Sequence, residues 1–355
     1  MELSELGFDS WFEEQAGKDR NPEYVPARVS AVDRDSYLVI SGKGEVLAKI
    51  EGKLRYNAGS SMELPAVGDW VYVRYLDNDT LAIINEVLPR KTFLRRKTSG
   101  RKTEYQMIAA NLDTAFIMQS LDLNFNLRRL ERYLVAVNEG GIKPVILLSK
   151  SDLVPAREIE EKVSSVFRLY GKPEVLVFSN KTEEGPGKIS GIMETGKTYC
   201  LIGSSGVGKT TLINRLLGEE VYATTEVREW ESRGRHTTNR RQLIALKSGG
   251  LLIDTPGMRE LGNISVEAGL AATFPDIAAL AGECRFNDCT HASEPGCAII
   301  AALEKGEIDA GYFKSYKKLR KETEFNEMTY AEKRQKDKEF GKFVKKVMKS
   351  PRKKY

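Results

Sequence analysis

A glycine-rich loop between a buried strand and a helix constrains the fold of this 355-residue chain more than any other feature. The sequence YCLIG predicts a strand, GSSGVGKT follows it, and TTLINRLLG predicts a helix. Glycines let such a loop curl until successive backbone N–H groups face one anion, and the helix N-terminus adds positive potential. This order indicates a phosphate-binding loop in an α/β domain.

The phosphate loop supplies most of the predicted nucleotide contacts. We expect Lys209 to reach the β and γ phosphates and the Thr210 hydroxyl to coordinate Mg²⁺. The residues predicted to bind nucleotide here are Gly203, Ser204, Ser205, Gly206, Val207, Gly208, Lys209, Thr210 and Thr211.

A second motif predicts that the base is guanine. The sequence SKSD ends the apolar strand PVILL and resembles the N/T-K-x-D guanine motif. The Asp152 carboxylate can accept hydrogen bonds from N1–H and the exocyclic amine of guanine, whereas adenine would leave it unpaired. Ser149 replaces the commoner Asn, so weaker bracing of the loop is expected. The residues predicted to contact the base are Ser149, Lys150, Ser151, Asp152, Ser179 and Asn180.

The order of these motifs is unusual. In an ordinary small GTPase the phosphate loop comes first, but here Asp152 precedes Gly203. Domain termini usually lie close together, so one sheet can be closed at one place and opened at another. We therefore predict a circularly permuted P-loop GTPase domain.

Two further segments match the switches of such a domain. In LLIDTPG, Asp254 is expected to hold Mg²⁺ through water and the Gly257 N–H to meet the γ-phosphate. In GRHTT, either Thr237 or Thr238 can add a second hydroxyl to Mg²⁺. Because the second switch lies close to the third region of the chain, we expect that region to read the nucleotide state mechanically.

The residue after the second switch predicts slow intrinsic hydrolysis. Met258 stands where many GTPases carry a glutamine that orients the attacking water, and a thioether cannot do this. His236 is the internal candidate for catalysis, because an imidazole can accept a proton or hydrogen-bond water near neutral pH. A histidine used only for docking is the alternative.

A cysteine and histidine cluster predicts a metal site in the third region. The ligand candidates Cys284, Cys289, His291 and Cys297 occur in CRFNDCTHASEPGC. Three thiolates and one imidazole suit tetrahedral Zn²⁺, and a closed shell of four implies a structural ion. Unliganded thiols are the alternative, and Cys200 is predicted to be a small buried hydrophobe.

The N-terminal part reads as a small β-barrel followed by basic segments. Short alternating strands between residues 24 and 97 suggest an OB-fold, with a barrel of another role as the alternative. The basic run 90–102 is read as a solvated linker or an RNA-facing edge. The tail 333–355 carries eleven Lys or Arg against two acids, which makes it a candidate for phosphate contacts.

These patterns give a multidomain α/β chain. The predicted divisions are an N-terminal extension (1–23), an OB-fold RNA-binding domain (24–97), a circularly permuted GTPase domain (98–273) and an α-helical zinc-binding domain with a basic tail (274–355). The acidic start lacks the features of a secretory signal and the apolar runs are short, so we expect a cytoplasmic protein without a membrane span.

The ordered set of barrel, SKSD, GSSGVGKT, GRHTT, DTPG and Cys-x4-Cys-x-His-x5-Cys resembles the bacterial ribosome small-subunit-dependent GTPase A family, also called YjeQ. The resemblance implies an OB-fold, a permuted GTPase core and a zinc domain. It also implies late maturation of the small (30S) subunit, contact with 16S rRNA and GTP hydrolysis that the subunit stimulates. We expect a monomer. The alternative function is a GTP-gated binding factor for another RNA or protein, and an inactive scaffold is disfavoured by the retained motifs.

Overall fold

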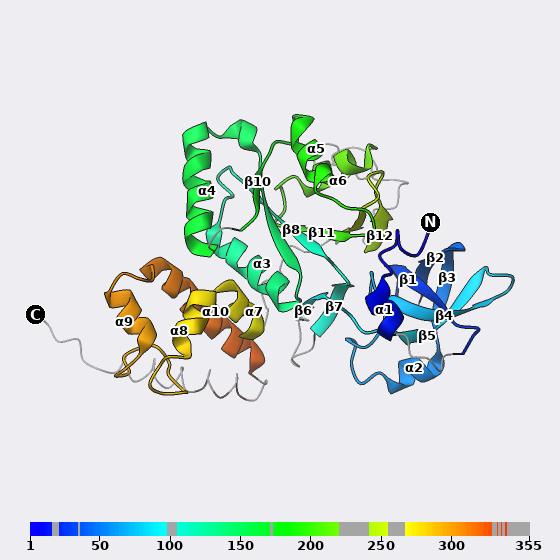
Figure 1. The fold of residues 1–355 in the computed structure, drawn as a ribbon, viewed down its shortest axis with the longest axis horizontal. Helices are drawn as coiled ribbons and strands as arrows, with labels where there is room; N and C mark the ends of the chain where they lie inside the picture. Colours follow the sequence, from blue (N-terminus) through cyan, green and yellow to red (C-terminus); the bar gives the residue numbers. More distant parts are fainter. Residues whose placement is uncertain are drawn as a thin grey trace, which may run out of the picture.

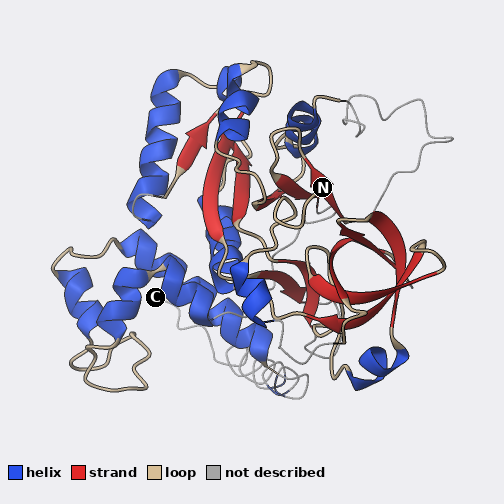
Figure 2. Ribbon diagram, turned by 45° about the vertical axis from the view of Figure 1, so that its right-hand side comes forward, coloured by secondary structure: helices blue, strands red, loops and turns tan. Residues whose placement is uncertain are grey.

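The computed structural model describes residues 1–15, 21–34, 36–97, 105–170, 173–219, 241–254 and 267–328, together with residues 332, 335 and 338. Within these ranges a β-barrel and a group of C-terminal helices flank a central α/β sheet on opposite sides (Figures 1 and 2). Among the described residues, no helix combines the length and the apolar character needed to cross a membrane.

The barrel is closed by five strands in the order β1-β2-β3-β5-β4, with β4 returning to β1. These strands are β1 (Val25–Val32), β2 (Tyr37–Ser41), β3 (Gly44–Ile50), β4 (Trp70–Leu76) and β5 (Leu81–Val87). β3 and β5 pair in parallel, whereas the other pairs are antiparallel. This confirms the predicted OB-type barrel. The short helix α2 (Gly52–Asn57) lies between β3 and β4, where the sequence pattern indicated only strands and turns.

The central sheet has the order β10-β9-β8-β11-β13-β12 and is parallel except for β12. Its strands are β8 (Thr114–Ser120), β9 (Lys143–Ser149), β10 (Val175–Val177), β11 (Thr198–Gly203), β12 (Gln242–Ala245) and β13 (Leu251–Asp254). All residues of β8 and β11 are buried. Parallel strands buried on both faces have continuous apolar runs, such as PVILL in β9, instead of alternating apolar and polar residues.

Helices cover both faces of this sheet. They are α3 (Leu127–Glu139), η1 (Ser151–Leu153), α4 (Ala156–Tyr170), α5 (Glu184–Gly191) and α6 (Lys209–Leu217). On one face Leu130 of α3 and Val166 of α4 pack against Ile117 of β8. On the other face Ile189 of α5 and Leu212 of α6 pack in the cluster that contains the next β8 residue, Phe116. Strands and helices therefore alternate along this part of the chain, which confirms the predicted α/β class.

A separate hairpin connects the barrel to the central sheet. It consists of β6 (Phe93–Lys97) and β7 (Tyr105–Ala110), which pair with each other. The backbone N–H of Phe93 donates to the carbonyl of Gly140, just beyond α3, at 3.1 Å. Part of the run 90–102, interpreted above as a solvated linker or an RNA-facing edge, is therefore a strand held against the region of the central sheet next to α3. The division between residues 97 and 98 stays a prediction.

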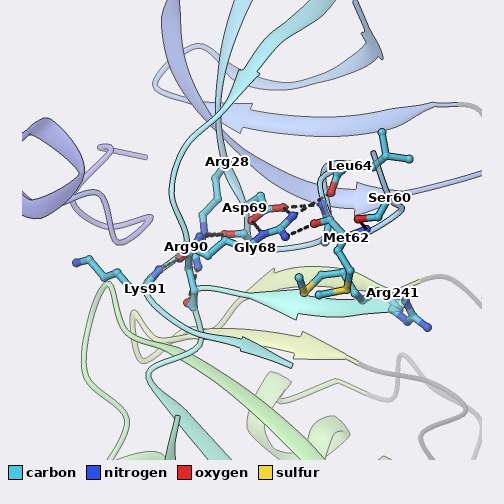
Figure 3. A network of polar contacts seen from close by, with 12 residues as sticks. Arg28, Ser60, Met62, Leu64, Gly68, Asp69, Arg90, Lys91 and Arg241 are labelled. Carbon is cyan, nitrogen blue, oxygen red and sulfur yellow. Dashed lines mark hydrogen bonds and ion pairs between the residues drawn. The ribbon is translucent and has the colours of Figure 1, made fainter. Parts of the chain in front are cut away.

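A buried polar network joins the barrel to the central sheet (Figure 3). Arg90 donates from Nε and Nη2 to the two carboxylate oxygens of Asp69, each at 2.7 Å. Arg28, which is 1% exposed, donates to the carbonyls of Gly68 at 3.2 Å and Asn111 at 3.1 Å, and also to that of Leu6. Burial lowers the pKa of Arg28 to about 10, so its side chain stays protonated at neutral pH.

Close backbone contact accompanies this network. A Cβ atom at Gly68, where φ is +89°, would lie 2.2 Å from the carbonyl oxygen of Ala110, so only glycine fits. β1 also pairs with β12 through Ala31 opposite Gln242. The barrel and the central sheet therefore form one continuous eleven-stranded sheet.

The C-terminal helices form their own core and attach to α3. They are α7 (Glu267–Thr273), α8 (Pro275–Ala281), α9 (Ala298–Glu304) and α10 (Ala310–Glu327). Phe274 and Ile299 are fully buried in this core, to which α7 contributes Leu270 and α3 contributes Val135. The division at residue 274 stays a prediction. Beyond α10, the described residues Glu332, Gln335 and Lys338 are helical, and the rest of the basic tail lies outside the described ranges.

Candidate nucleotide-binding site and metal centre

The phosphate loop leaves β11 and enters α6 with the backbone shape that its glycines permit. Gly206 has φ +77° and Gly208 has φ +95°, and both values are costly for other residues. A Cβ atom at Gly208 would also lie 2.7 Å from Nδ2 of Asn180. Lys209 Nζ donates to the carbonyls of Gly203 at 2.7 Å and Ser204 at 2.6 Å, which holds its ammonium over the loop. The loop is thus tightly curved, and the ammonium group of Lys209 lies against its backbone.

The predicted guanine loop lies beside the phosphate loop. Ser149 is fully buried at the end of β9, and its hydroxyl donates to the carbonyl of Val207 at 2.7 Å. Asn180 Nδ2 donates to the carbonyl of Gly208 at 3.1 Å. These bonds tie residues from three predicted segments together. Bracing by Ser149 therefore exists, although its replacement of Asn led us to expect weaker bracing.

The carboxylate predicted to read the base is ionised and held in place. Asp152 accepts a hydrogen bond from the Ser179 hydroxyl at 2.6 Å and forms an ion pair with Lys181 at 2.9 Å. These two partners lower the pKa of Asp152 below its ordinary value, with the Ser179 bond as the larger cause. A carboxylate charged at neutral pH and fixed in direction suits a pair of donors on a base edge.

Lys150 is placed by a second carboxylate that the sequence reasoning missed. Its backbone is left-handed, with φ +59°, and its Nζ lies 2.8 Å from Asp122. Burial raises the pKa of Asp122, but hydrogen bonds from Lys150, the Ser120 hydroxyl and the Asn124 backbone outweigh it and lower the value to about 2. Asp122 follows β8 directly, and polar residues at the carboxyl ends of parallel strands are the signal that would have found it.

The loop after β8 also reaches the phosphate loop. Arg129, in the first turn of α3, donates from Nη1 to the Ser204 hydroxyl at 2.6 Å and to Oδ1 of Asn124 at 3.0 Å. Asn124 Nδ2 in turn lies 3.3 Å from the same hydroxyl. Neither residue was predicted from the sequence, because no short motif contains them.

The predicted switch residues are described only in part. β13 runs parallel to β11 with Ile253 opposite Cys200, so Asp254 leaves the sheet at the edge that carries the phosphate loop. Its role at Mg²⁺ stays a prediction. The residues that lie outside the described ranges are Thr255, Pro256, Gly257, Met258 and the segment 234–238 with His236, Thr237 and Thr238.

The four metal-ligand candidates converge. Single ligand atoms of Cys284, Cys289, His291 and Cys297 all lie within 4.8 Å of one another. His291 Nδ1 is 3.6 Å from the sulfurs of Cys284 and Cys297, and these sulfurs are 3.9 Å apart. Tetrahedral Zn²⁺ with Zn–S bonds of about 2.3 Å requires sulfurs about 3.8 Å apart. The donor set and its spacing therefore fit Zn²⁺.

The loop that carries these ligands is fixed by one glutamate. The Glu294 carboxylate accepts hydrogen bonds from the backbone N–H groups of Thr290, Ala292 and Ser293, and from the Thr290 hydroxyl. These bonds, led by the one from the hydroxyl, hold the pKa of Glu294 well below its usual range. Cys200 is fully buried on β11, away from the cluster in sequence, and burial raises its pKa to about 12, as expected of a thiol that is a small hydrophobe.

Comparison with known proteins gives a consistent result. The family model described as RsgA GTPase matches residues 87–264. The Small ribosomal subunit biogenesis GTPase RsgA 2 of Vibrio parahaemolyticus is 41% identical over 99% of this chain and 94% of that protein. The Small ribosomal subunit biogenesis GTPase RsgA of Opitutus terrae is 42% identical over 91% of this chain and 90% of that protein.

Solved structures share the fold. The crystal structure of YjeQ from Thermotoga maritima has a TM-score of 0.63 at 24% identity, over 84% of this chain and 98% of that one. The crystal structure of YloQ, described as a circularly permuted GTPase, has a TM-score of 0.61 at 25% identity, over 87% of this chain and 98% of that one. The permuted order predicted from the motifs is therefore also found in a solved structure.

Proposed function

This chain belongs to the RsgA GTPase family and is a GTPase, and we propose that it hydrolyses GTP in the biogenesis of the small ribosomal subunit. The names of its relatives support this setting. Within the chain, the observation that carries the proposal is the bond from the Ser149 hydroxyl to the Val207 carbonyl. It holds the base-reading loop and the phosphate loop in one site, as recognition of a whole guanine nucleotide requires.

The described residues have distinct roles in this proposal. Asp152 reads the guanine edge and Lys150 lies along the purine, while the N–H groups of the phosphate loop and Lys209 hold the phosphates. Thr210 and Asp254 would hold Mg²⁺, and a hydroxyl with a carboxylate is an oxygen donor set that suits this ion. Bound Mg²⁺ supplies charge neutralisation between the β and γ phosphates.

The switch segments complete the proposed site. We assign Gly257 to the γ-phosphate, Thr237 or Thr238 to Mg²⁺, and His236 to orienting the attacking water. These roles rest on the motifs alone. Replacing His236 with Ala is expected to lower turnover while sparing nucleotide affinity, and unchanged turnover measured by phosphate release would contradict its catalytic role.

The Cys₃His cluster is proposed to hold one structural Zn²⁺. Four protein ligands close the shell and leave no open position for a substrate. The ion would fix the loop between α8 and α9, because all four ligands lie in it. Removing it with a chelator is expected to unfold the C-terminal helices first, which circular dichroism would detect.

The proposed partner is the small ribosomal subunit, through its 16S rRNA. An OB-type barrel and the basic tail 333–355 support contacts with phosphate groups at separate points. We propose that the chain acts as a cytoplasmic monomer and that the subunit stimulates its GTP hydrolysis, because Met258 leaves the site without the usual water-orienting glutamine.

The test is GTP turnover by the purified chain, alone and with purified small subunits. Large subunits at the same mass concentration are the control for a general effect of RNA. We expect stimulation by small subunits only, and binding that weakens steeply with salt. Turnover that no subunit changes would favour the alternative, a GTP-gated binding factor for another RNA or protein.

A further inference from the structure

Helix α3 begins with an unusual charge pattern. Its first turn, LRRL, contains two arginines and no acidic residue. The N-terminus of a helix carries positive potential, so cations there are locally unfavourable. A residue that works against its local structure and is nevertheless present often serves a site.

The arginines of α3 differ in their partners. Arg128 pairs with the buried carboxylate of Glu131 at 3.0 Å, and Arg132 pairs with Glu322 of α10 at 2.9 Å. Arg129 instead donates to two neutral oxygens, the Ser204 hydroxyl and Oδ1 of Asn124. Among the residues that the structure describes, no carboxylate forms an ion pair with Arg129. Its positive charge is therefore not neutralised there, and it lies beside a loop built for an anion.

The bond to Ser204 places this charge at the start of the phosphate loop. The carbonyl of the same serine accepts a hydrogen bond from the ammonium group of Lys209 at 2.6 Å. Arg129 and Lys209 therefore hold Ser204 from its side chain and its backbone. The Arg129 guanidinium still has N–H groups beyond Nη1, since it carries five donors in all.

We propose that Arg129 is a positioning residue of the GTPase centre. It fixes the Ser204 hydroxyl, keeps the first turn of the phosphate loop in the shape that Lys209 needs, and adds positive charge where the phosphates lie. Groups that are already in place when charge develops contribute most to the rate. This inference rests on the proposed GTPase function and adds to it a residue that no phosphate-loop or switch motif contains.

Removing the guanidinium is the first test. Arg129→Met keeps the aliphatic stem, and it keeps the helix cap, because that cap is the Arg129 backbone N–H donating to Asn126 at 3.1 Å. The loss of a charged hydrogen bond is expected to lower kcat for GTP by roughly tenfold, with KM and the GDP dissociation constant within about twofold. Arg129→Lys is expected to recover part of kcat, because an ammonium can still donate to both oxygens.

Two further variants separate positioning from a general effect on folding. Ser204→Ala removes the other end of the bond, so the double variant is expected to have the kcat of Arg129→Met rather than the product of both losses. Arg157→Met removes an arginine from the exposed pair with Glu161 on α4 and is the matched control, with unchanged kcat.

The outcomes are distinct. Unchanged kcat in Arg129→Met, fully additive losses with Ser204→Ala, or an equal loss in GTP and GDP affinity without a change in kcat would each overturn the inference. A wild-type chain that does not hydrolyse GTP would overturn the proposed function, and this inference with it. Active wild type with reduced kcat, partial rescue by Lys and non-additive losses supports it.

Discussion

Charged side chains have different kinds of partner at the two edges of the central sheet, where the strands begin (the amino edge) and where they end (the carboxyl edge). At the amino edge, Arg28 and Asp69 are buried, the Arg90 side chain is only 15% exposed, and each of the three is bound by other groups of the chain. At the carboxyl edge, Lys209 contacts loop carbonyls and Arg129 contacts a hydroxyl and an amide. A network whose members bind one another stabilises a fixed joint, whereas a cation such as Arg129, which donates to neutral oxygens, can exchange these acceptors for phosphate oxygens.

The largest effect is expected at the amino edge. Asp69→Ala would leave the Arg90 side chain, which is only 15% exposed, without its carboxylate, and the loss of such a partner typically costs about 3–5 kcal/mol. We expect the free energy of unfolding, measured with urea, to fall by this amount while the GTP and GDP affinities of the folded protein stay the same. Glu161→Ala, in the exposed pair with Arg157, is the control, with a change below about 1 kcal/mol. A large loss of nucleotide affinity in Asp69→Ala would show that the amino edge is not a purely structural joint.

Replacing Asp152, the carboxylate proposed to read the base, is expected to have the next largest effect. It should change nucleotide affinity far more than stability. Asp152→Asn replaces one acceptor with a donor, so guanine binding is expected to weaken by on the order of a hundredfold, while loss of the exposed pair with Lys181 changes stability by less than about 1 kcal/mol. Xanthosine triphosphate carries a carbonyl where guanine has its amine, and it should bind the variant better than GTP does. Titration with fluorescent nucleotides measures both affinities. Equal affinity of wild type and variant for GTP would remove Asp152 from base recognition.

Ser149 combines features of both edges, because it lies at the carboxyl edge but is fully buried, like Asp69 at the amino edge. Ser149→Ala leaves the Val207 carbonyl without its donor, so we expect about 1 kcal/mol less stability and roughly fivefold weaker GTP binding. Ser165→Ala removes a hydroxyl bonded within α4 and serves as the control that loses stability only. Loss of stability in Ser149→Ala with full GTP affinity would show that the two loops do not depend on this bond.

The smallest effect concerns pH. The pKa of Asp122 is lowered from 3.8 to about 2 in the folded chain, so its contribution to stability is present above pH 3.8 and is lost as the pH falls towards 2. Asp122→Asn is expected to be about 1 kcal/mol less stable than wild type near pH 5, and this difference should shrink on acidification. Urea unfolding of both proteins at several pH values checks this. A difference that stays constant with pH would mean that the charge of Asp122 is not responsible.

Sequence reasoning found those parts of the molecule that repeat a local pattern. The phosphate loop, the strand and helix alternation and the four metal ligands each depend on neighbours in the chain, and the structure brings each group together as expected. Asp122 and Arg129 were missed because their partners, Lys150 and Ser204, come from other strands, and only the sheet order places them nearby. The buried joint was missed for the same reason, since Arg90 looked like one more member of a basic run.

How well Ser149 braces the loop cannot be judged from the motif alone. A shorter side chain than Asn suggested poorer bracing, but β9 brings Ser149 close enough to Val207 for its hydroxyl to donate at 2.7 Å. Side-chain reach can be judged only when the backbone separation is known, and that separation is set by the order of strands.

The permuted order also has a consequence for the time course of synthesis. β8 pairs with β9 on one side and with β11 on the other, and all seven of its residues are buried. When the ribosome has just made Ser120, the partner strand that ends at Gly203 is still 83 residues away (203 − 120). At roughly 5–20 residues per second, this apolar strand edge stays without its neighbour for about 4–17 seconds. The nascent chain thus has a bare strand edge for seconds before the sheet that holds its nucleotide can close.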